Sequence, residues 1–194
     1  MLINLEGIDG CGKSTQSQFL MDKFESDNEK IILLKEPTNG KYGQKLWEML
    51  SGKIEATTEE ILELFVLDRR ERVNQKIQPA LDEGKIVLMD RYYYSTMAYQ
   101  AAAGIDVNRI RKDNEFAPKP DIVLIFDLPA DLAMKRVRSH SVADVFEKEE
   151  YLEKVRKAYL NLEDDSLVRI IDATRTPEEI FDEVWKLVSE VRNG

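Results

Sequence analysis

Cysteine is nearly absent from this chain of 194 residues, in which Cys11 is the only one. A single cysteine excludes an internal disulfide and a zinc site built from cysteines. This scarcity favours a cytoplasmic setting, where thiols stay reduced. The sequence also has no apolar run near the roughly 20 residues that a bilayer-spanning helix needs. We therefore expect no membrane-spanning segment, and we expect no secretory signal peptide.

Positive charge is outnumbered by negative charge, with 28 Lys and Arg residues against 37 Asp and Glu residues. The formal net charge of -9 argues against nonspecific binding to DNA or RNA, which rests on basic surface. An anionic small substrate would instead need Lys and Arg gathered locally. The sequence shows no internal repeat, low-complexity tract or interdomain linker. We therefore expect residues 1–194 to form a single domain.

The stretch from Gly7 to Thr15 has the spacing of a phosphate-binding loop, G-x-x-x-x-G-K-[ST]. Glycines let the backbone turn its N–H groups toward phosphate oxygens, and the helix that follows directs its positive end at the same anion. Lys13 adds charge near the β- and γ-phosphates, and the Ser14 hydroxyl can bind Mg²⁺. The expected ATP-binding residues of this loop are Gly7, Ile8, Asp9, Gly10, Cys11, Gly12, Lys13, Ser14 and Thr15.

Hydrophobic patterning predicts that strands and helices alternate. Five short apolar runs are typical of strands buried on both faces, and they cover residues 1–5, 31–36, 86–90, 122–128 and 168–173. Helices are expected over 42–50, from Thr57 with a break or kink at Pro79, over 92–103, from Asp131 toward residue 138, over 147–162 and from Thr176, with a loop over 139–144. This pattern indicates a three-layer α/β fold, in which a five-stranded parallel sheet has helices on both faces.

Candidate site residues follow three of the predicted strands at their carboxyl ends, where parallel α/β sheets bind ligands. The phosphate loop follows the first strand, Glu36-Pro37 ends the second and Asp90-Arg91 ends the third. Asp90 can hold Mg²⁺ through water, or it can accept a proton from an attacking oxygen. Arg91 can grip a second phosphate with two hydrogen bonds. These strand ends therefore predict a site for two phosphate groups.

Two further stretches, Asp90-Arg91-Tyr92 and Ala98-Tyr99-Gln100, are more specific than the phosphate loop, which many NTPases share. Glu36-Pro37, Pro120-Asp121 and Ile171-Asp172-Ala173 extend the pattern nearly end to end. With these stretches the chain resembles the thymidylate kinase family, whose members have the P-loop NTPase fold and a short lid, here at about 136–147. The resemblance implies transfer of the ATP γ-phosphate to dTMP, giving dTDP and ADP, with Mg²⁺ as cofactor and in a homodimer.

The resemblance also implies roles for residues at the phosphate end of the acceptor site. Asp9 helps to hold the acceptor, and Arg91 bridges the acceptor phosphate and the γ-phosphate. Lys35 stands where the family usually has an arginine, and we expect it to bind the acceptor. Thr38 replaces a glycine of the family pattern, and Trp47 replaces an arginine that commonly helps to bind the acceptor phosphate.

At the base end, the resemblance assigns four residues. Phe65 stacks on thymine, and Arg69 contacts a thymine carbonyl. Their spacing of four places both on one helix face, so an aromatic plane and a guanidinium can meet one base. Thr96 reads the other base edge, and Tyr99 packs against the deoxyribose and disfavours a 2′-hydroxyl.

The family brings an arginine to the γ-phosphate either from the phosphate loop or from the lid. Gly10 stands at the loop position and Val145 at the lid position, so neither supplies it. Arg136 best matches the arginine that stacks on adenine, which leaves Arg138 for the γ-phosphate. The expected catalytic residues are therefore Asp9, Lys13, Asp90, Arg91 and Arg138, with Ser14 and Asp90 at the metal.

Two other classes of function are weighed against this one. A kinase for another pyrimidine deoxynucleotide or for a deoxynucleoside shares these motifs, but a deoxynucleoside has no phosphate for Asp9, Lys35 and Arg91 to bind. A purine monophosphate needs a larger pocket than these side chains suggest. A nucleotide-gated switch is disfavoured by Asp90-Arg91 together with a base-stacking aromatic residue.

Overall fold

Five parallel strands form the central sheet, in the order β2-β3-β1-β4-β5. The computed structural model describes residues 1–136 and 142–194, without the side chains of 142–148. Its strands are β1 (Leu2–Glu6), β2 (Ile31–Lys35), β3 (Ile86–Asp90), β4 (Ile122–Asp127) and β5 (Val168–Asp172). All five expected strands are confirmed, and their ends differ from the expected ones by no more than one residue.

The register of the sheet brings the site residues to one edge. Asp90, at the end of β3, pairs with Leu5 of β1 and with Lys35 of β2. On the other side of β1, Glu6 pairs with Ile125. Strands β1 and β3 are buried at every residue, because helices cover both faces of the sheet. The segments that follow β1, β2 and β3 therefore leave the sheet side by side.

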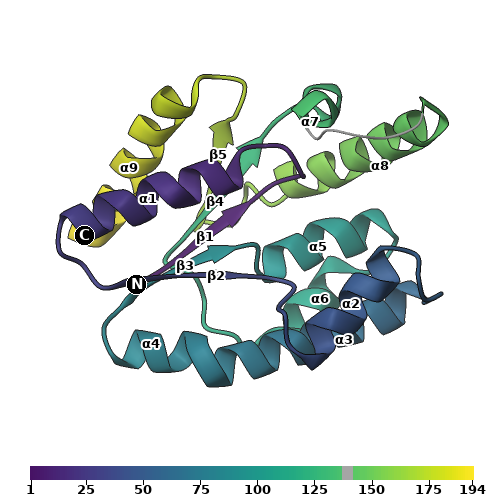
Figure 1. Cartoon of the computed structure of the whole chain (residues 1–194), viewed down its shortest axis with the longest axis horizontal. Coiled ribbons are helices and arrows are strands. Elements are labelled where there is room, and N and C mark those ends of the chain that lie inside the picture. Colours follow the sequence, from purple (N-terminus) through teal and green to yellow (C-terminus); the bar gives the residue numbers. More distant parts are fainter. Residues whose placement is uncertain (137–141) are drawn as a thin grey trace.

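Helices form the two outer layers (Figure 1). On one face, α1 (Lys13–Ser26) lies beside α9 (Pro177–Asn193). The ring of Phe24 in α1 packs against Trp185 in α9, with centroids 5.2 Å apart. The other face is covered by α3 (Thr58–Arg72), α4 (Gln78–Asp82), α5 (Tyr93–Ala102) and α8 (Val142–Leu160). The three-layer α/β fold is therefore confirmed.

The helix that begins after Thr57 does not break at Pro79. Thr57 and Glu60 form the expected capping box, but α3 continues through a π-helical segment, η1 (Val73–Ile77), into α4. Pro79 lies in the first turn of α4, where the wider turn before it accommodates a residue without an N–H. The sequence also predicts an apolar side of this helix made of Ile61, Leu64, Phe65 and Leu67. That prediction is partly wrong, because Leu67 is 41% exposed while Asp68 and Arg69 are buried.

Two short helices pack near the acceptor side of the sheet. α2 (Lys41–Leu50) begins one residue before its expected start. α6 (Val107–Asp113) was not expected, and the Asp106 side chain caps it by accepting a hydrogen bond from the Arg109 backbone N–H at 2.9 Å. A polar helix of seven residues has little apolar periodicity, which explains why patterning did not indicate it.

The helices on either side of the expected lid differ from expectation at their ends. α7 (Ala130–Arg136) takes its first backbone hydrogen bonds on the Pro129 carbonyl, so Asp131 lies inside the helix and does not cap it. α8 begins at Val142, so residues 142–144 are helical and not part of a loop. Residues 139–141 lie outside the described part of the chain. No helix in the described ranges is long and apolar enough to cross a membrane.

Candidate active site

Glycines with left-handed backbone make the turns of the phosphate loop. Gly7, Gly10 and Gly12 have φ angles of 133°, 85° and 101°, where other residues are strained. Gly7 also has no room for a side chain, because a Cβ would lie 2.7 Å from the Phe126 carbonyl oxygen and 2.8 Å from Cys11 Sγ. Since α1 begins at Lys13, directly after this loop, its first N–H groups face the cavity that the loop lines.

Lys13 is folded into the loop. Its side chain is buried, and Nζ donates hydrogen bonds to the carbonyl oxygens of Gly7 at 3.0 Å and Ile8 at 3.1 Å. Burial lowers the pKa of Lys13, and the nearby charge of Arg91 lowers it further. A phosphate in the loop would compete with the two carbonyls for this amine. The neighbouring Ser14 and Thr15 are exposed, and the Ser14 hydroxyl is open to the cavity.

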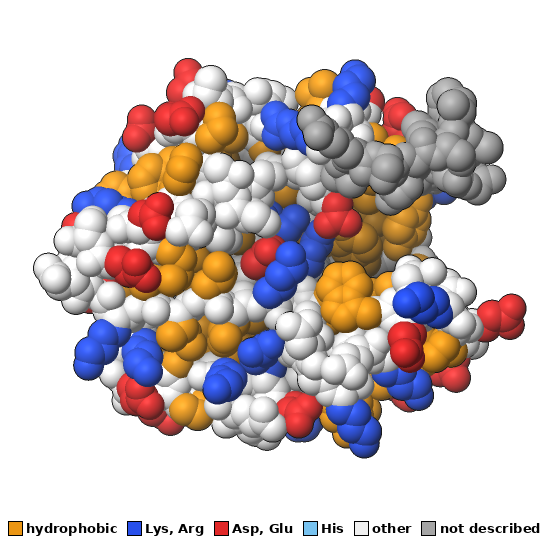
Figure 2. All heavy atoms as spheres, in the orientation of Figure 1, with side chains coloured by type: hydrophobic (Ala, Val, Ile, Leu, Met, Phe, Trp, Pro, Cys, Tyr) orange, Lys and Arg blue, Asp and Glu red, His pale blue; other side chains and the backbone are white. Residues whose placement is uncertain are grey.

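A cleft beside the phosphate loop has a volume of about 470 Å³. Figure 2 shows basic and acidic side chains gathered on the face that lies between α1 and α3. Of the expected site residues, Lys35, Asp90, Arg91 and Arg136 line this cleft together with the loop. Arg175, Pro177 and Ile180 also line it, and sequence reasoning missed all three. Arg136 Nη2 donates to the Ala173 carbonyl at 3.3 Å, which holds it beside the cleft.

Arg91 connects the phosphate loop to α5. Its backbone has φ of 72°, a conformation that is uncommon outside glycine and turns the chain sharply after β3. Its Nη2 donates to Asp9 Oδ1 at 2.6 Å and to the Tyr99 hydroxyl at 3.4 Å. The guanidinium carbon also lies 5.2 Å from the centre of the Tyr99 ring. The structure therefore brings together Asp9, Arg91 and Tyr99, as the sequence predicted.

The buried carboxylate of Glu6 is linked to Arg91 through the hydroxyls of Ser95 and Tyr159. Glu6, with 0% exposure, accepts hydrogen bonds from the Tyr92 backbone N–H at 2.7 Å, from Ser95 Oγ at 2.5 Å and from the Tyr159 hydroxyl at 2.9 Å. Burial raises the pKa of Glu6, although the Ser95 hydrogen bond and the Arg91 charge oppose this. Sequence reasoning assigned no role to Glu6, Ser95 or Tyr159, because these residues come from distant parts of the chain and meet only in the fold.

The two carboxylate oxygens of Asp90 differ in their contacts. Oδ2 forms an ion pair with Lys35 Nζ at 3.2 Å, while Oδ1 is buried and has no hydrogen-bond partner among the described residues. Mg²⁺ prefers oxygen ligands and keeps several waters. The Asp90 carboxylate and the Ser14 hydroxyl both line the cleft, so this donor set fits Mg²⁺ held partly through water.

Arg69 lies in a closed polar cluster. It has 0% exposure, and its guanidinium donates to Glu36 Oε2 at 2.6 and 3.0 Å, to Asn114 Oδ1 at 2.5 Å and to Thr96 Oγ1 at 3.0 Å. The structure therefore joins Arg69 directly to Thr96, although the resemblance assigns these two residues to different edges of the base. Burial raises the pKa of Glu36 to about 6, against the opposing charge of Arg69.

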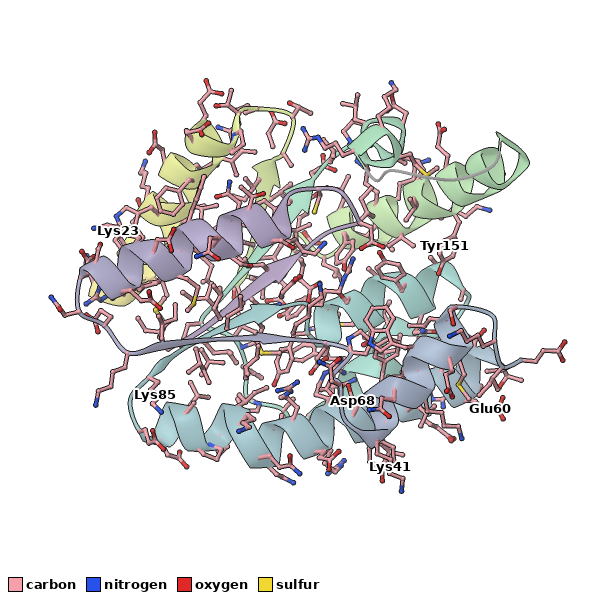
Figure 3. The ribbon with its side chains drawn as sticks, viewed as in Figure 1. Lys23, Lys41, Glu60, Asp68, Lys85 and Tyr151 are labelled. Carbon is pink, nitrogen blue, oxygen red and sulfur yellow. The ribbon has the colours of Figure 1, made fainter. Side chains whose placement is uncertain are left out.

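Aromatic rings surround the rest of the acceptor side. Phe65 and Tyr99 are partly buried. Tyr151 extends from α8 toward α5 (Figure 3), where its ring meets Tyr99 edge to face with centroids 6.4 Å apart. Burial raises the pKa of Tyr99 to about 12, so its hydroxyl stays protonated at neutral pH. Arg138, expected at the γ-phosphate, lies outside the described residues, and so does the side chain of Val145.

The segment after β2 is tied to α3 beside this cluster. Asp68, labelled in Figure 3, accepts hydrogen bonds from the Thr38 backbone N–H at 2.8 Å and from Thr38 Oγ1 at 2.6 Å. The glycine that the family usually has at this position could not form the side-chain hydrogen bond that Thr38 Oγ1 donates to Asp68. Trp47 is not among the residues that line the cleft at the phosphate loop, and its side chain is 48% exposed.

Comparisons with known proteins agree on one family. The family model for thymidylate kinase matches residues 5–184. A probable thymidylate kinase of Archaeoglobus fulgidus is 42% identical over 194 residues, which cover 100% of this chain and 97% of the relative. A thymidylate kinase of Desulfotalea psychrophila is 47% identical over 163 residues, 83% of this chain and 81% of the relative. A probable thymidylate kinase of Thermococcus kodakarensis is 40% identical, with 97% of each chain covered. The chain belongs to the thymidylate kinase family.

Proposed function

We propose that the chain transfers the γ-phosphate of ATP to dTMP, giving dTDP and ADP. The position of Arg91 carries this proposal, since Nη2 lies 2.6 Å from Asp9 on the phosphate loop and 3.4 Å from the Tyr99 hydroxyl on α5. One cation thus faces both the donor loop and the acceptor side, as charge stabilisation between two phosphates requires. Family membership and the names of the relatives support the same reaction.

On the donor side, the loop residues from Gly7 to Thr15 bind the ATP phosphates through backbone N–H groups and Lys13. Arg136 packs against the adenine from α7, and Arg175 and Ile180 supply the opposite side of the same cleft. Arg138 acts on the γ-phosphate from the lid, about residues 136–147. Replacing Arg138 with Met should lower turnover at least about tenfold with little change in dTMP binding, and a variant within twofold of wild type would remove Arg138 from the mechanism.

On the acceptor side, Asp9, Lys35 and Arg91 bind the dTMP phosphate, Phe65 stacks on thymine and Tyr99 packs against the deoxyribose. Arg69 faces a thymine carbonyl, and Thr96 faces the other base edge. Because Arg69 is fully buried by its protein partners, a thymine carbonyl reaches its guanidinium only when neighbouring side chains shift. Arg69 and Thr96 then act on the base from one connected cluster.

The Ser14 hydroxyl and the Asp90 carboxylate would hold Mg²⁺. When bound, the ion supplies positive charge on the phosphate oxygens of ATP. Lys35 pairs with Oδ2 of Asp90, and the buried Oδ1, which has no hydrogen-bond partner among the described residues, would bind the metal or its water.

A coupled assay of ADP formation tests the function directly. With ATP and Mg²⁺, we expect turnover with dTMP, weaker turnover with dUMP, and little with dCMP, dGMP or thymidine. A preference for thymidine over dTMP would make the chain a deoxynucleoside kinase. Tight ATP binding with only slow hydrolysis, whatever the acceptor, would make it a nucleotide-gated switch and overturn the proposal.

Residues 1–194 act as a single domain that works in the cytoplasm and forms a homodimer. The lone Cys11, buried in the phosphate loop, is consistent with a reducing setting. Exposed large apolar residues on and after α2 and on α3 suggest where the two copies meet, namely Trp47, Leu50, Ile54 and Leu67.

A further inference from the structure

Arg91 has two edges with different partners. Nη2 faces the cleft, where it meets Asp9 and the Tyr99 hydroxyl. Nη1 faces the interior, where it donates to Ser95 Oγ at 3.1 Å and to the Tyr159 hydroxyl at 3.3 Å. A guanidinium Nη atom carries two hydrogens. Both hydrogens of Nη1 are therefore used for anchoring, and the reactive side of Arg91 is its Nη2 edge.

The two hydroxyls that accept hydrogen bonds from Nη1 also form hydrogen bonds with Glu6. A hydroxyl has one hydrogen to donate and can accept in return. Ser95 and Tyr159 each accept from Arg91, and each lies within hydrogen-bond distance of Glu6 Oε2, at 2.5 and 2.9 Å. The two hydroxyls also lie 2.9 Å from each other, and each can accept from Arg91 while it donates to Glu6. Burial raises the pKa of Tyr159, so its hydroxyl keeps the proton that it donates.

Tyr159 comes from a part of the chain remote from the other three. It lies in α8, is 1% exposed, and its ring also meets the Tyr99 ring edge to face at 6.3 Å. Arg91 otherwise has a left-handed backbone and an exposed acid partner, since Asp9 is 66% exposed. On the cleft side, Arg91 is held by this exposed acid and by the hydroxyl and ring of Tyr99. The interior anchor adds buried contacts that restrict the long side chain further.

We propose that Tyr159 is a positioning residue for phosphoryl transfer: with Ser95, it anchors Nη1 of Arg91 to Glu6, so that the Nη2 edge stays turned toward the phosphate loop. This inference rests on the proposed function, in which Arg91 stabilises the migrating phosphoryl group. Tyr159 itself touches neither nucleotide. Losing its hydroxyl should therefore affect the transition state more than nucleotide binding, because transfer depends on exact orientation of charge.

The test compares Tyr159→Phe with Tyr94→Phe. Tyr94 is an equally buried tyrosine whose hydroxyl donates to a carboxylate, Asp165, at 3.0 Å, but away from Arg91. Tyr94→Phe loses a part-buried hydrogen bond to a carboxylate, so it controls for the loss of a tyrosine hydroxyl that does not touch Arg91. We expect kcat with dTMP to fall about tenfold in Tyr159→Phe, with the KM for ATP within about twofold, whereas Tyr94→Phe keeps kcat within about twofold.

A double-mutant cycle then separates positioning from a general structural role. Lysine has one Nζ in place of the two Nη atoms, so an Arg91→Lys enzyme cannot divide its contacts between anchor and cleft. In that background, Tyr159→Phe should change kcat less than about twofold. An unchanged kcat in Tyr159→Phe, or an equal loss in both backgrounds, would overturn the inference.

The remaining outcomes are also decisive. If Tyr159→Phe does not fold, Ser95→Ala removes the other hydroxyl of the anchor, and the same cycle with Arg91→Lys applies to it. If the wild-type enzyme does not use dTMP, the proposed function fails before any variant is compared. The two failures are therefore distinguishable.

Discussion

Arg91 is the residue on which the proposed chemistry depends most. Its side chain is only 13% exposed, and its guanidinium is paired with Asp9 on the phosphate loop. Arg91→Ala should lower turnover roughly 100-fold or more, because it removes charge stabilisation where two phosphates meet. The control is Arg109→Ala, a half-exposed arginine paired with Glu59 on the surface. Steady-state kinetics and a melting curve check both variants, and Arg91→Ala with more than a tenth of wild-type turnover would refute the assignment.

Glu6 gives a prediction about pH. Burial raises the pKa of Glu6 above the ordinary 4.5. Between the ordinary pKa and the raised one, the folded protein therefore binds more protons than the unfolded chain. The stability that this group contributes is complete below its ordinary pKa and is lost as pH rises through the folded value. The free energy of unfolding of wild type, relative to Glu6→Gln, should therefore fall as the pH rises above the ordinary carboxyl pKa of 4.5. Urea titrations at several pH values measure this difference, and a rise with pH would contradict it.

Residues within one motif could be predicted, while residues joined only by the fold could not. Lys13, Asp90 and Arg91 stand beside glycines or at strand ends, where local sequence fixes their chemistry. Glu6 and Tyr159 are 153 positions apart, and only the packing of α8 brings them together. The contact of Arg69 with Thr96 was not expected, and its complete burial follows from Glu36 and Asn114, which no spacing connects.

Among the helices, the sequence predicted where two of them begin, but it did not predict the π-helical segment within the long helix after Thr57. The expected helix starts at Thr57 and Thr176 are confirmed, and both residues form capping boxes, with Glu60 and Glu179. The π-helical η1 and the polar α6 were missed. In α6, Ile110 is the one buried residue, so no apolar stripe marks it. Five continuous apolar strands, in contrast, needed no tertiary information.

The caps also give a prediction. Thr57→Ala and Thr176→Ala should each lower the free energy of unfolding by about 1 kcal/mol, because each leaves a helix N–H without its hydroxyl partner. Thr58→Ala is the matched control, since Thr58 is the first residue of α3 and not its cap. Urea denaturation measures all three. An equal loss in Thr58→Ala would mean that the cap hydroxyls contribute nothing specific.

At the scale of the whole molecule, the exposed apolar residues on α2 and α3 predict self-association. Trp47 and Leu67 are 48% and 41% exposed. If they lie between two copies, Trp47→Glu or Leu67→Glu should turn a dimer into a monomer, because a buried unpaired charge is costly. The control is Leu33→Glu, which adds the same charge to β2 at a residue that is 42% exposed. Light scattering gives the mass, and a dimer that survives both substitutions would place the interface elsewhere.

The central place of β1 in the sheet has a consequence for synthesis of the chain. β1 is made first, yet Ile3 pairs with Leu88 on one side and with Ile122 on the other. At typical rates of translation, the second partner follows on the order of 10 s later. Throughout that interval an apolar strand with open edges is available to other nascent chains. The order of strands that builds the phosphate site thus places the demand for chaperone protection on the first half of the polypeptide, before any nucleotide can bind.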